Sequence, residues 1–318
     1  MAKRLFKNNS NDFKDLGFGT QIKGRRMLNE DGSFNVIRKG VKGQSIMNLY
    51  TSLITMSWMR FNVIVLSYYL IINLIFAALY MLIGKDSLIG ESANNLQDHF
   101  WNAFFFSAQT ITTVGYGYIH PSGMISNFLA AIESMAGLFG FALATGLLYG
   151  RFSRPVAKIL FSNKAVIAPY QGATAFMFRL ANLRSNQLID TNATLNFSMM
   201  VKKDGVEKRI FDRLKLERDK IDFFPTSWTI VHPINENSPI YGMTEDEVNE
   251  SDAEFILLLS AFDDTFSQTV HARRSYKHYE IEWGAKFPPM TGDPENNKTV
   301  LFLDKIDNTI KAELPTSD

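Results

Sequence analysis

The sequence contains no cysteine. This absence excludes a disulfide framework, a thiolate zinc site, an iron–sulfur cluster and a cysteine nucleophile. An excess of one charge is also missing, because 33 Lys and Arg stand against 32 Asp and Glu. This balance argues against a general nucleic-acid-binding protein. No G-x-G-x-x-G unit follows a predicted strand, and the five histidines show no metal-ligand spacing. A nucleotide-sensing Rossmann domain and a histidine metal site are therefore not expected.

The apolar residues are unevenly distributed along the chain. The length of 318 residues allows about two domains, and the mean hydropathy of −0.06 is that of a soluble protein. Residues 61–83, however, carry no charge, and residues 124–150 carry only one charged side chain, Glu133. At about 1.5 Å per residue, either segment can cross a membrane as a helix. The alternative is two buried core helices of a soluble protein. After Arg151 the chain becomes charged, with short alternating runs.

The basic residues indicate an orientation in the membrane. Eleven Lys and Arg precede the first span, whereas the connection at 84–123 contains only Lys85, and further basic residues follow the second span. The positive-inside rule therefore predicts that both termini are cytoplasmic and that the connection faces outward. The first basic residues are not followed by an apolar segment, so we expect no secretory signal.

The outward connection carries the most informative motif. Residues 100–111 are apolar but too few to span a membrane, and they predict a re-entrant helix at about 97–112. The sequence Thr-Thr-Val-Gly-Tyr-Gly at 112–117 follows it and matches the filter of potassium channels. A stack of backbone carbonyls there would replace the water around a dehydrated K⁺. The predicted K⁺ ligands are Thr113, Val114, Gly115, Tyr116 and Gly117.

Each residue type in this motif has a physical role. The two glycines adopt backbone conformations closed to other residues, so that successive carbonyls turn toward one axis. The hydroxyl of Thr113 supplies the innermost layer of oxygens. The side chains of Val114 and Tyr116 are expected to pack away from the axis, against the pore helix.

Further segments resemble the prokaryotic branch of the inward-rectifier potassium channel family (KirBac type). They are residues 15–19 (DLGFG), 49–62, 136–155, 232–242 and 260–276. The resemblance implies a homotetramer in the bacterial inner membrane that conducts K⁺ and has neither enzymatic activity nor an organic cofactor. The implied fold is a helical membrane pore, with two transmembrane helices plus slide and pore helices, joined to a cytoplasmic all-β, immunoglobulin-like sandwich.

The predicted division of the chain has four parts. They are a cytoplasmic N-terminal segment (1–45), an interfacial slide helix (46–60), the pore domain (61–155) and a regulatory β-sandwich (156–318). The slide helix follows from helical spacing that ends in Trp58 and Arg60, with an ordinary soluble helix as the alternative. The sandwich follows from short strands between turn signals, and Thr244 begins a capping box. The turn signals lie at 203–205, 232–233, 237–239 and 263–264.

The second span contains the predicted gate. In the family, the position of Tyr149 holds a bulky aromatic side chain, and four such rings can dewet a narrow pore. A tyrosine that faces lipid at the membrane interface is the alternative. Gly137, Gly140 and Gly146 would let the helix bend or pack closely, and Gly137 and Gly146 are the predicted hinges.

Two other positions in this span bear on conduction. Strong rectifiers carry an acidic residue where this sequence has Phe141, so we expect weak block by intracellular Mg²⁺ or polyamines. Asp263 and Asp264 could contribute from the cytoplasmic pore. An ionisable group within a span is expected to be functional. The family resemblance implies that Glu133 supports the pore helix behind the filter, with direct contact to the ion as the alternative.

Basic residues gather at the predicted inner leaflet. Arg60, Arg151, Arg154 and Lys158 are candidates for binding anionic, phosphoinositide-like lipid head groups, whereas a role in topology alone is the alternative. Two other functions stay open from sequence. One is a ligand-gated two-helix potassium channel outside the rectifier branch, which a Rossmann regulatory domain would reveal. The other is a membrane-anchored sensor that does not conduct.

Overall fold

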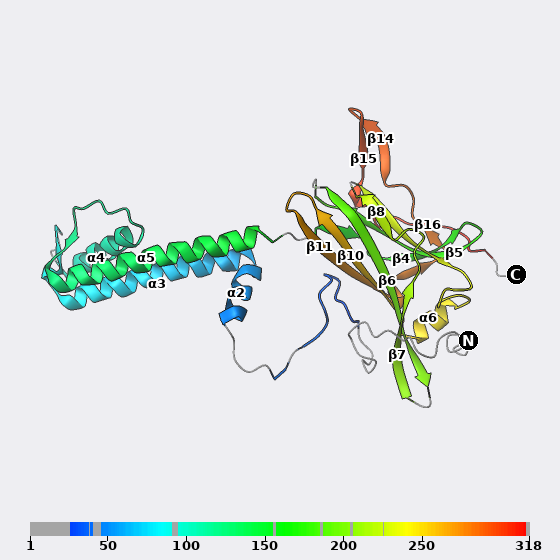
Figure 1. Cartoon of the computed structure of the whole chain (residues 1–318), viewed down its shortest axis with the longest axis horizontal. Helices are drawn as coiled ribbons and strands as arrows, with labels where there is room; N and C mark the ends of the chain where they lie inside the picture. Colours follow the sequence, from blue (N-terminus) through cyan, green and yellow to red (C-terminus); the bar gives the residue numbers. More distant parts are fainter. Residues whose placement is uncertain are drawn as a thin grey trace. The chain divides into compact units, whose positions relative to one another are not determined.

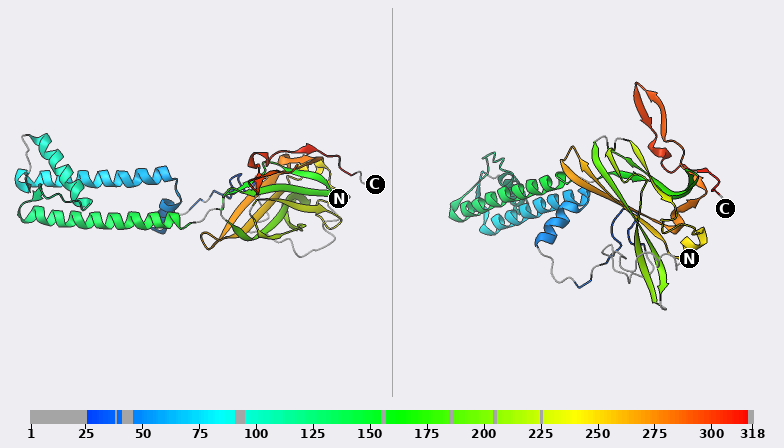
Figure 2. Two further views of the ribbon diagram at one scale, coloured as in Figure 1. Left: turned by 90° about the horizontal axis from the view of Figure 1, so that it is seen from above. Right: turned by 45° about the vertical axis from the view of Figure 1, so that its right-hand side comes forward.

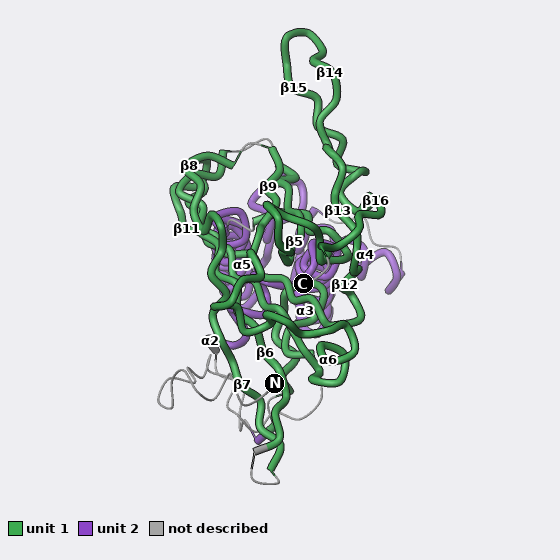
Figure 3. The backbone as a smooth tube through the Cα atoms, turned by 90° about the vertical axis from the view of Figure 1, so that its right-hand side faces the viewer, with its two compact units in different colours: residues 1–39, 155–318 green, residues 40–154 purple. Residues whose placement is uncertain are grey.

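The computed structural model describes residues 26–315 apart from 38, 41–45, 91–94, 155–156, 185–186, 204–205 and 225. The chain forms two compact units, one of residues 40–154 and one of residues 1–39 with 155–318 (Figure 3). The predicted N-terminal motif at 15–19 and most of the turn at 203–205 lie outside the described residues.

Two long helices dominate the first unit (Figure 1). It contains α2 (Ile46–Thr55), α3 (Trp58–Ile83), η1 (Lys85–Ser87), β1 (Leu88–Ile89), α4 (Leu96–Ile111), β2 (His120–Pro121) and α5 (Gly123–Phe152). The most apolar windows of α3 and α5 have mean hydropathies of 2.2 and 1.6, yet only 22% and 11% of their residues are buried. Long apolar helices that expose most of their surface suit a membrane and contradict the alternative of soluble core helices.

The slide helix differs from its predicted bounds of 46–60. Helix α2 ends at Thr55, and Ser57 has an extended backbone (φ −60°, ψ 151°) at the N-cap of α3. Trp58 and Arg60 therefore lie in the first turn of the outer helix. The apolar pattern runs through this break without a glycine or proline, which is why helical spacing alone joins the two helices.

The second unit is a sandwich of two five-stranded sheets, which confirms the predicted all-β domain (Figure 2). The first sheet is antiparallel, in the order β11–β10–β6–β7 with β8 on β6; the second has the order β12–β4–β5–β3 with β9 on β5. Side chains from both sheets meet in one core, where the rings of Phe176 (β5) and Phe255 (β10) stack with centroids 4.0 Å apart.

The strands of the first sheet are β6 (Leu188–Lys203), β7 (Val206–Leu214), β8 (Lys220–Phe223), β10 (Glu254–Asp263) and β11 (Gln268–Lys277). Those of the second are β3 (Ile159–Phe161), β4 (Ala165–Tyr170), β5 (Ala173–Asn182), β9 (Ser227–Ile234) and β12 (Ile281–Trp283). The other elements are α6 (Glu245–Glu250), η2 (His278–Glu280), η3 (Leu303–Lys305) and two ribbons, β13 (Ala285–Lys286) with β16 (Ile310–Lys311) and β14 (Thr291–Glu295) with β15 (Lys298–Leu301).

Two local predictions for this unit have different outcomes. The capping box of α6 is confirmed, since the Thr244 hydroxyl accepts from the Glu247 amide and the Glu247 carboxylate accepts from the Thr244 amide. The predicted turn at 232–233 instead lies inside β9, paired with β5. His232 is buried there, with its ring nitrogens 2.7 Å from the Lys215 carbonyl oxygen and 2.8 Å from the Ser238 hydroxyl. Those two contacts satisfy a polar side chain within a strand.

An N-terminal stretch packs on the sandwich. The backbone amide of Met27 donates to both carboxylate oxygens of the buried Glu254, each at 3.1 Å. The Ser275 hydroxyl donates to the carbonyl of Leu28, and the Arg26 side chain forms an ion pair with Glu280 at 3.0 Å. A stretch far away in sequence is thus fixed to β10, β11 and η2.

A buried ionic cluster joins α6 to the first sheet. The carboxylate of Asp252 pairs with Arg209 from β7 and with Lys277 from the end of β11. The Arg209 side chain is fully buried, and that of Lys277 is 5% exposed. Burial would raise the pKa of Asp252, but the hydrogen bond and charge of Lys277, together with those of Arg209, hold the pKa below its ordinary value.

We predict that Asp252→Asn destabilises the sandwich by about 2 kcal/mol, because it leaves two buried cations without their carboxylate. A lowered folded-state pKa gives stability that is present above the unfolded-state value and is lost as the pH falls through the folded-state value. Thermal unfolding of the full chain should therefore depend less on pH below about 4 in the variant. Glu250→Gln, an exposed acid on α6, is the control. Equal losses in both variants would contradict a specific role of the cluster.

Candidate functional site

The predicted filter begins where the short helix α4 ends. Asn95 caps the start of this helix by accepting from the Asp98 amide at 2.8 Å, and the helix closes at Ile111. The amides of Val114 and Gly115 then donate to the carbonyl of Gln109, at 2.9 and 3.3 Å. The last turn of α4 thus holds the first filter amides. The observed helix lies within one residue of the predicted 97–112.

The backbone of the predicted filter, residues 113–117, alternates in handedness. Thr113, Gly115 and Gly117 have φ values of +61°, +52° and +84°, whereas Val114 and Tyr116 between them do not have positive φ. Alternation between right- and left-handed conformations turns successive carbonyls to the same side of the chain, as a stack of ion ligands requires. Glycine adopts the left-handed form without strain, whereas Thr113 does so at a cost of about 1–2 kcal/mol.

The side chains of the filter are not covered within one chain. Val114 is 53% exposed and Tyr116 is 76% exposed. The packing of these side chains against the pore helix, which the sequence predicts, is therefore not made by a single copy. Trp101 and Phe105 on α4 stack on each other and are also about half exposed. A single chain thus provides one filter strand with an uncovered aromatic surface on its pore helix.

Glu133 connects three helices behind the filter. Its Oε2 accepts a hydrogen bond from the Tyr80 hydroxyl (α3) at 2.9 Å, and its Oε1 is hydrogen bonded to the Ser107 hydroxyl (α4). Glu133 and Ser107 are both fully buried. This location fits the predicted support of the pore helix better than contact with a permeating ion.

Gly137 brings the pore helix close to α5. A Cβ at this position would lie 2.4 Å from the carbonyl oxygen of Ile111. Helix α5 is nevertheless helical from Gly123 to Phe152. A Cβ at Gly146, by contrast, would meet no atom within 4 Å. The geometry therefore gives Gly137 a packing role, and Gly146 is the freer of the two predicted hinges.

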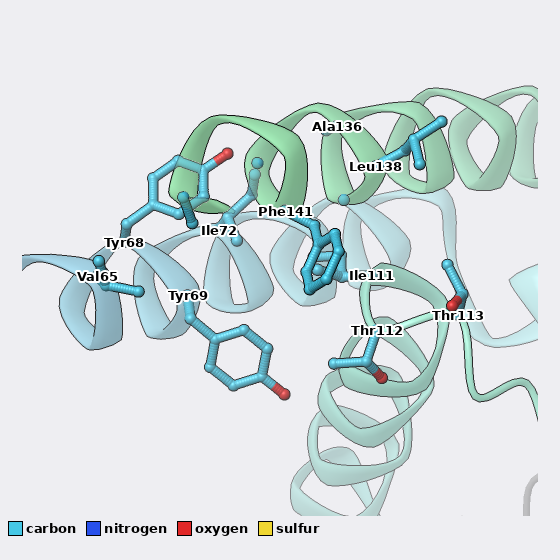
Figure 4. A pocket seen from close by; sticks show the side chains of 13 residues that line it. Val65, Tyr68, Tyr69, Ile72, Ile111, Thr112, Thr113, Ala136, Leu138 and Phe141 are labelled. Carbon is cyan, nitrogen blue, oxygen red and sulfur yellow. The ribbon is translucent and has the colours of Figure 1, made fainter. Parts of the chain in front are cut away.

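A cavity of about 600 Å³ lies between α3, the end of α4 and α5. Phe141, at the predicted rectification position, is one of its lining residues and is 74% exposed. Figure 4 shows the rings of Tyr69 and Phe141 extending into this space, on the side where Thr112 and Thr113 lie. Phe141 therefore places an apolar ring beside the inner end of the filter segment.

The last turn of α5 presents two contrasting side chains. Tyr149, the predicted gate, is 74% exposed. Arg151 instead turns toward α2, where its guanidinium donates to the carbonyls of Leu53 at 2.7 Å and Met56 at 2.8 Å. The same group lies 4.5 Å from the ring centroid of Trp58. Of the predicted head-group ligands, Arg151 is thus engaged within the chain, whereas Arg60, Arg154 and Lys158 are exposed.

The two units match known families separately. Residues 159–318 match the inward rectifier potassium channel C-terminal domain, and residues 64–154 match an ion channel family. The chain belongs to the inward rectifier potassium channel family. The all-β C-terminal unit excludes the Rossmann-type alternative, and the family comprises ion channels rather than enzymes.

Individual members of this family are similar over much of the chain. The inward rectifier potassium channel Kirbac3.1 of Paramagnetospirillum magnetotacticum is 39% identical over 282 residues, which cover 88% of this chain and 94% of that protein. ATP-sensitive inward rectifier potassium channel 11 of Oryctolagus cuniculus is 26% identical over 91% of this chain and 79% of its own length. ATP-sensitive inward rectifier potassium channel 12 of Gallus gallus is 28% identical over 63% of this chain and 49% of its own length. The predicted prokaryotic branch is confirmed.

The sequence did not predict three polar side chains of the buried hydrogen-bond network that includes Glu133. Tyr80, Ser107 and Asn73 are fully buried and hydrogen bonded around Glu133. An amide such as Asn73 within an apolar span was the available signal. The contact of Arg151 with α2 had no comparable signal, because it depends on how two helices distant in sequence pack.

We predict that Gly137→Ala destabilises the pore by about 2 kcal/mol, since the new methyl group overlaps the Ile111 carbonyl and the backbone must shift. Gly146→Ala adds the same group in open space and should keep or raise helix stability. Thermal unfolding of the full chain in detergent measures both effects. Equal stability of the two variants would contradict the packing role of Gly137.

Proposed function

We propose that this chain forms a homotetrameric, K⁺-selective, weakly rectifying channel in a bacterial inner membrane, with both termini cytoplasmic. The observation that carries the proposal is the alternating backbone of residues 113–117 at the end of a short pore helix. One chain supplies one strand of carbonyls, and a closed ring of ligands needs several copies around an axis. The exposure of Val114 and Tyr116 supports this assembly, because neighbouring copies would cover them.

In this channel the parts have the following roles. The K⁺ ligands are Thr113, Val114, Gly115, Tyr116 and Gly117; Tyr149 forms the gate, and Gly146 is the hinge. We infer weak block by Mg²⁺ or polyamines because Phe141 offers an apolar ring in place of a carboxylate. Anionic lipid head groups would bind Arg60 and Arg154 of the first unit at the cytoplasmic face of the membrane, and Lys158 of the second unit is a separate candidate for such binding. Arg151 would instead couple the slide helix to the inner helix.

We predict that the purified protein in liposomes passes Rb⁺, that Ba²⁺ blocks this flux, and that Na⁺ flux stays near background. K⁺-like ions exchange their water for the filter carbonyls, whereas Na⁺ is coordinated less well. Tracer uptake with and without anionic lipid, at fixed protein content, measures selectivity and lipid response together. Equal Na⁺ and Rb⁺ flux would contradict K⁺ selectivity, and an absence of all flux in every lipid would favour a non-conducting sensor.

We predict that Tyr149→Ala raises Rb⁺ flux, because removal of four large rings widens the constriction and lets water enter it. Phe152→Ala is the matched control. Phe152 is an exposed aromatic residue of the same helix turn, but its ring packs on Trp58 with centroids 5.1 Å apart. Unchanged flux in Tyr149→Ala would support the alternative of a lipid-facing tyrosine.

A further inference from the structure

A chain of hydrogen bonds crosses the membrane helices behind the filter. Its members are Asn73 and Tyr80 on α3, Ser107 on α4 and Glu133 on α5, and all four are fully buried. The Asn73 amide nitrogen donates to the carbonyl of Tyr69 at 2.7 Å. This bond fixes the orientation of the amide, because the opposite orientation would place two acceptors against each other. The Asn73 Oδ1 is therefore an acceptor that faces Ser107.

The hydrogen bonds of Ser107 depend on how many hydrogens are available at its two contacts. The Ser107 oxygen lies within hydrogen-bond distance of two acceptor atoms, Glu133 Oε1 and, at 3.1 Å, Asn73 Oδ1. A serine hydroxyl has one hydrogen, and an ionised carboxylate has none. If Glu133 were ionised, one of these two buried contacts would join two acceptors without a proton between them. One additional hydrogen resolves the conflict.

We infer that Glu133 is a neutral carboxylic acid that donates to Ser107, which in turn donates to Asn73. Every hydrogen bond then has one donor and one acceptor, from the Tyr80 hydroxyl through Glu133, Ser107 and Asn73 to the Tyr69 carbonyl.

The surroundings of Glu133 agree with a neutral group. In the part of the chain that the structure describes, the titratable side chain hydrogen bonded to Glu133 is Tyr80 from α3, while α4 contributes the Ser107 hydroxyl. Among the described residues, no ion pair includes Glu133. A fully buried carboxylate without a cation is costly at membrane depth, and protonation removes that cost.

This chain of hydrogen bonds through Tyr80, Glu133, Ser107 and Asn73 is called the relay below. It gives Asn73 and Ser107 a positioning role. Ser107 lies on α4 two residues before Gln109, whose carbonyl holds the amides of Val114 and Gly115. The relay thus fixes the part of the pore helix that holds the filter, between α3 on one side and α5 on the other. Its effect on ion flux rests on the proposed channel function, whereas the protonation state of Glu133 does not.

Infrared spectroscopy of the full chain in an ester-free detergent tests the protonation state directly. The difference spectrum of wild type minus Glu133→Gln should show the carbonyl band of a protonated carboxylic acid at neutral pH. In Ser107→Ala this band should shift, because the acid loses its hydrogen-bond acceptor. A carboxylate band in place of the acid band would overturn the inference, whether or not the protein conducts.

Flux selectivity tests the positioning role. Glu133→Gln should keep the wild-type ratio of Rb⁺ to Na⁺ flux, because an amide donates to Ser107 and accepts from Tyr80 as the neutral acid does. Asn73→Leu and Ser107→Ala should lower the ratio about tenfold, as expected for a buried hydrogen-bonding group left without its partner. Asn73 would be dispensable if Glu133 were ionised and took the serine hydrogen, so a wild-type ratio in Asn73→Leu overturns the relay.

Ser126→Ala is the matched control. The Ser126 hydroxyl is also fully buried in this unit, and no hydrogen-bond partner for it is found among the described residues. Its removal should leave both the infrared band and the flux ratio unchanged. A loss of selectivity in Ser126→Ala as large as in Ser107→Ala would overturn the assignment to the relay. Absence of Rb⁺ flux from wild type would refute the proposed function instead.

Discussion

The proposed filter depends on how firmly its pore helix, α4, is held by α3 and α5. Two contacts hold it at adjacent levels of α5. Glu133 is hydrogen bonded to Ser107 and Tyr80, and all three side chains are fully buried. Gly137, which has no side chain, lets the Ile111 carbonyl approach α5 closely. The carbonyl of Gln109 then accepts hydrogen bonds from the backbone amides of Val114 and Gly115. The strained backbone of Thr113 is maintained by this set of contacts rather than by its own preference.

The last turn of α5 is held by a second set of contacts. Arg151 donates to carbonyls at the C-terminal end of α2, where the helix dipole favours a cation, and its guanidinium stacks on Trp58. Movement of α2 would therefore act on α5 two residues from Tyr149. Helix α5 is thus held at Glu133 and Gly137 and again at Arg151. The stretch between them contains Gly146, which agrees with the proposed hinge at that residue.

The sequence predicted the elements whose signal is local and missed those that depend on packing between distant segments. The spans at 61–83 and 124–150 follow from uninterrupted apolar runs, and the proposal of a filter rests on five adjacent residues. The break at Ser57 was missed because the apolar pattern continues through it. The sequence predicts a turn at 232–233, whereas the structure has a strand there, because the pairing of these residues with β5 and the contact of the His232 ring with Lys215 arise only on folding.

The two units stabilise an acidic side chain in different ways. The partly exposed carboxylate of Asp252 pairs with the buried side chains of Arg209 and Lys277, which reach it from separate strands. Glu133 has no such cation among the described residues, and its hydrogen-bond partners there are the hydroxyl groups of Tyr80 and Ser107. A cation beside the filter would repel permeating ions across a low-dielectric protein, whereas a neutral acid supports the pore helix without changing the field there. Hydrogen bonds without a buried ion pair therefore support the pore helix, whereas the ionic cluster of Asp252 lies in the β-sandwich unit.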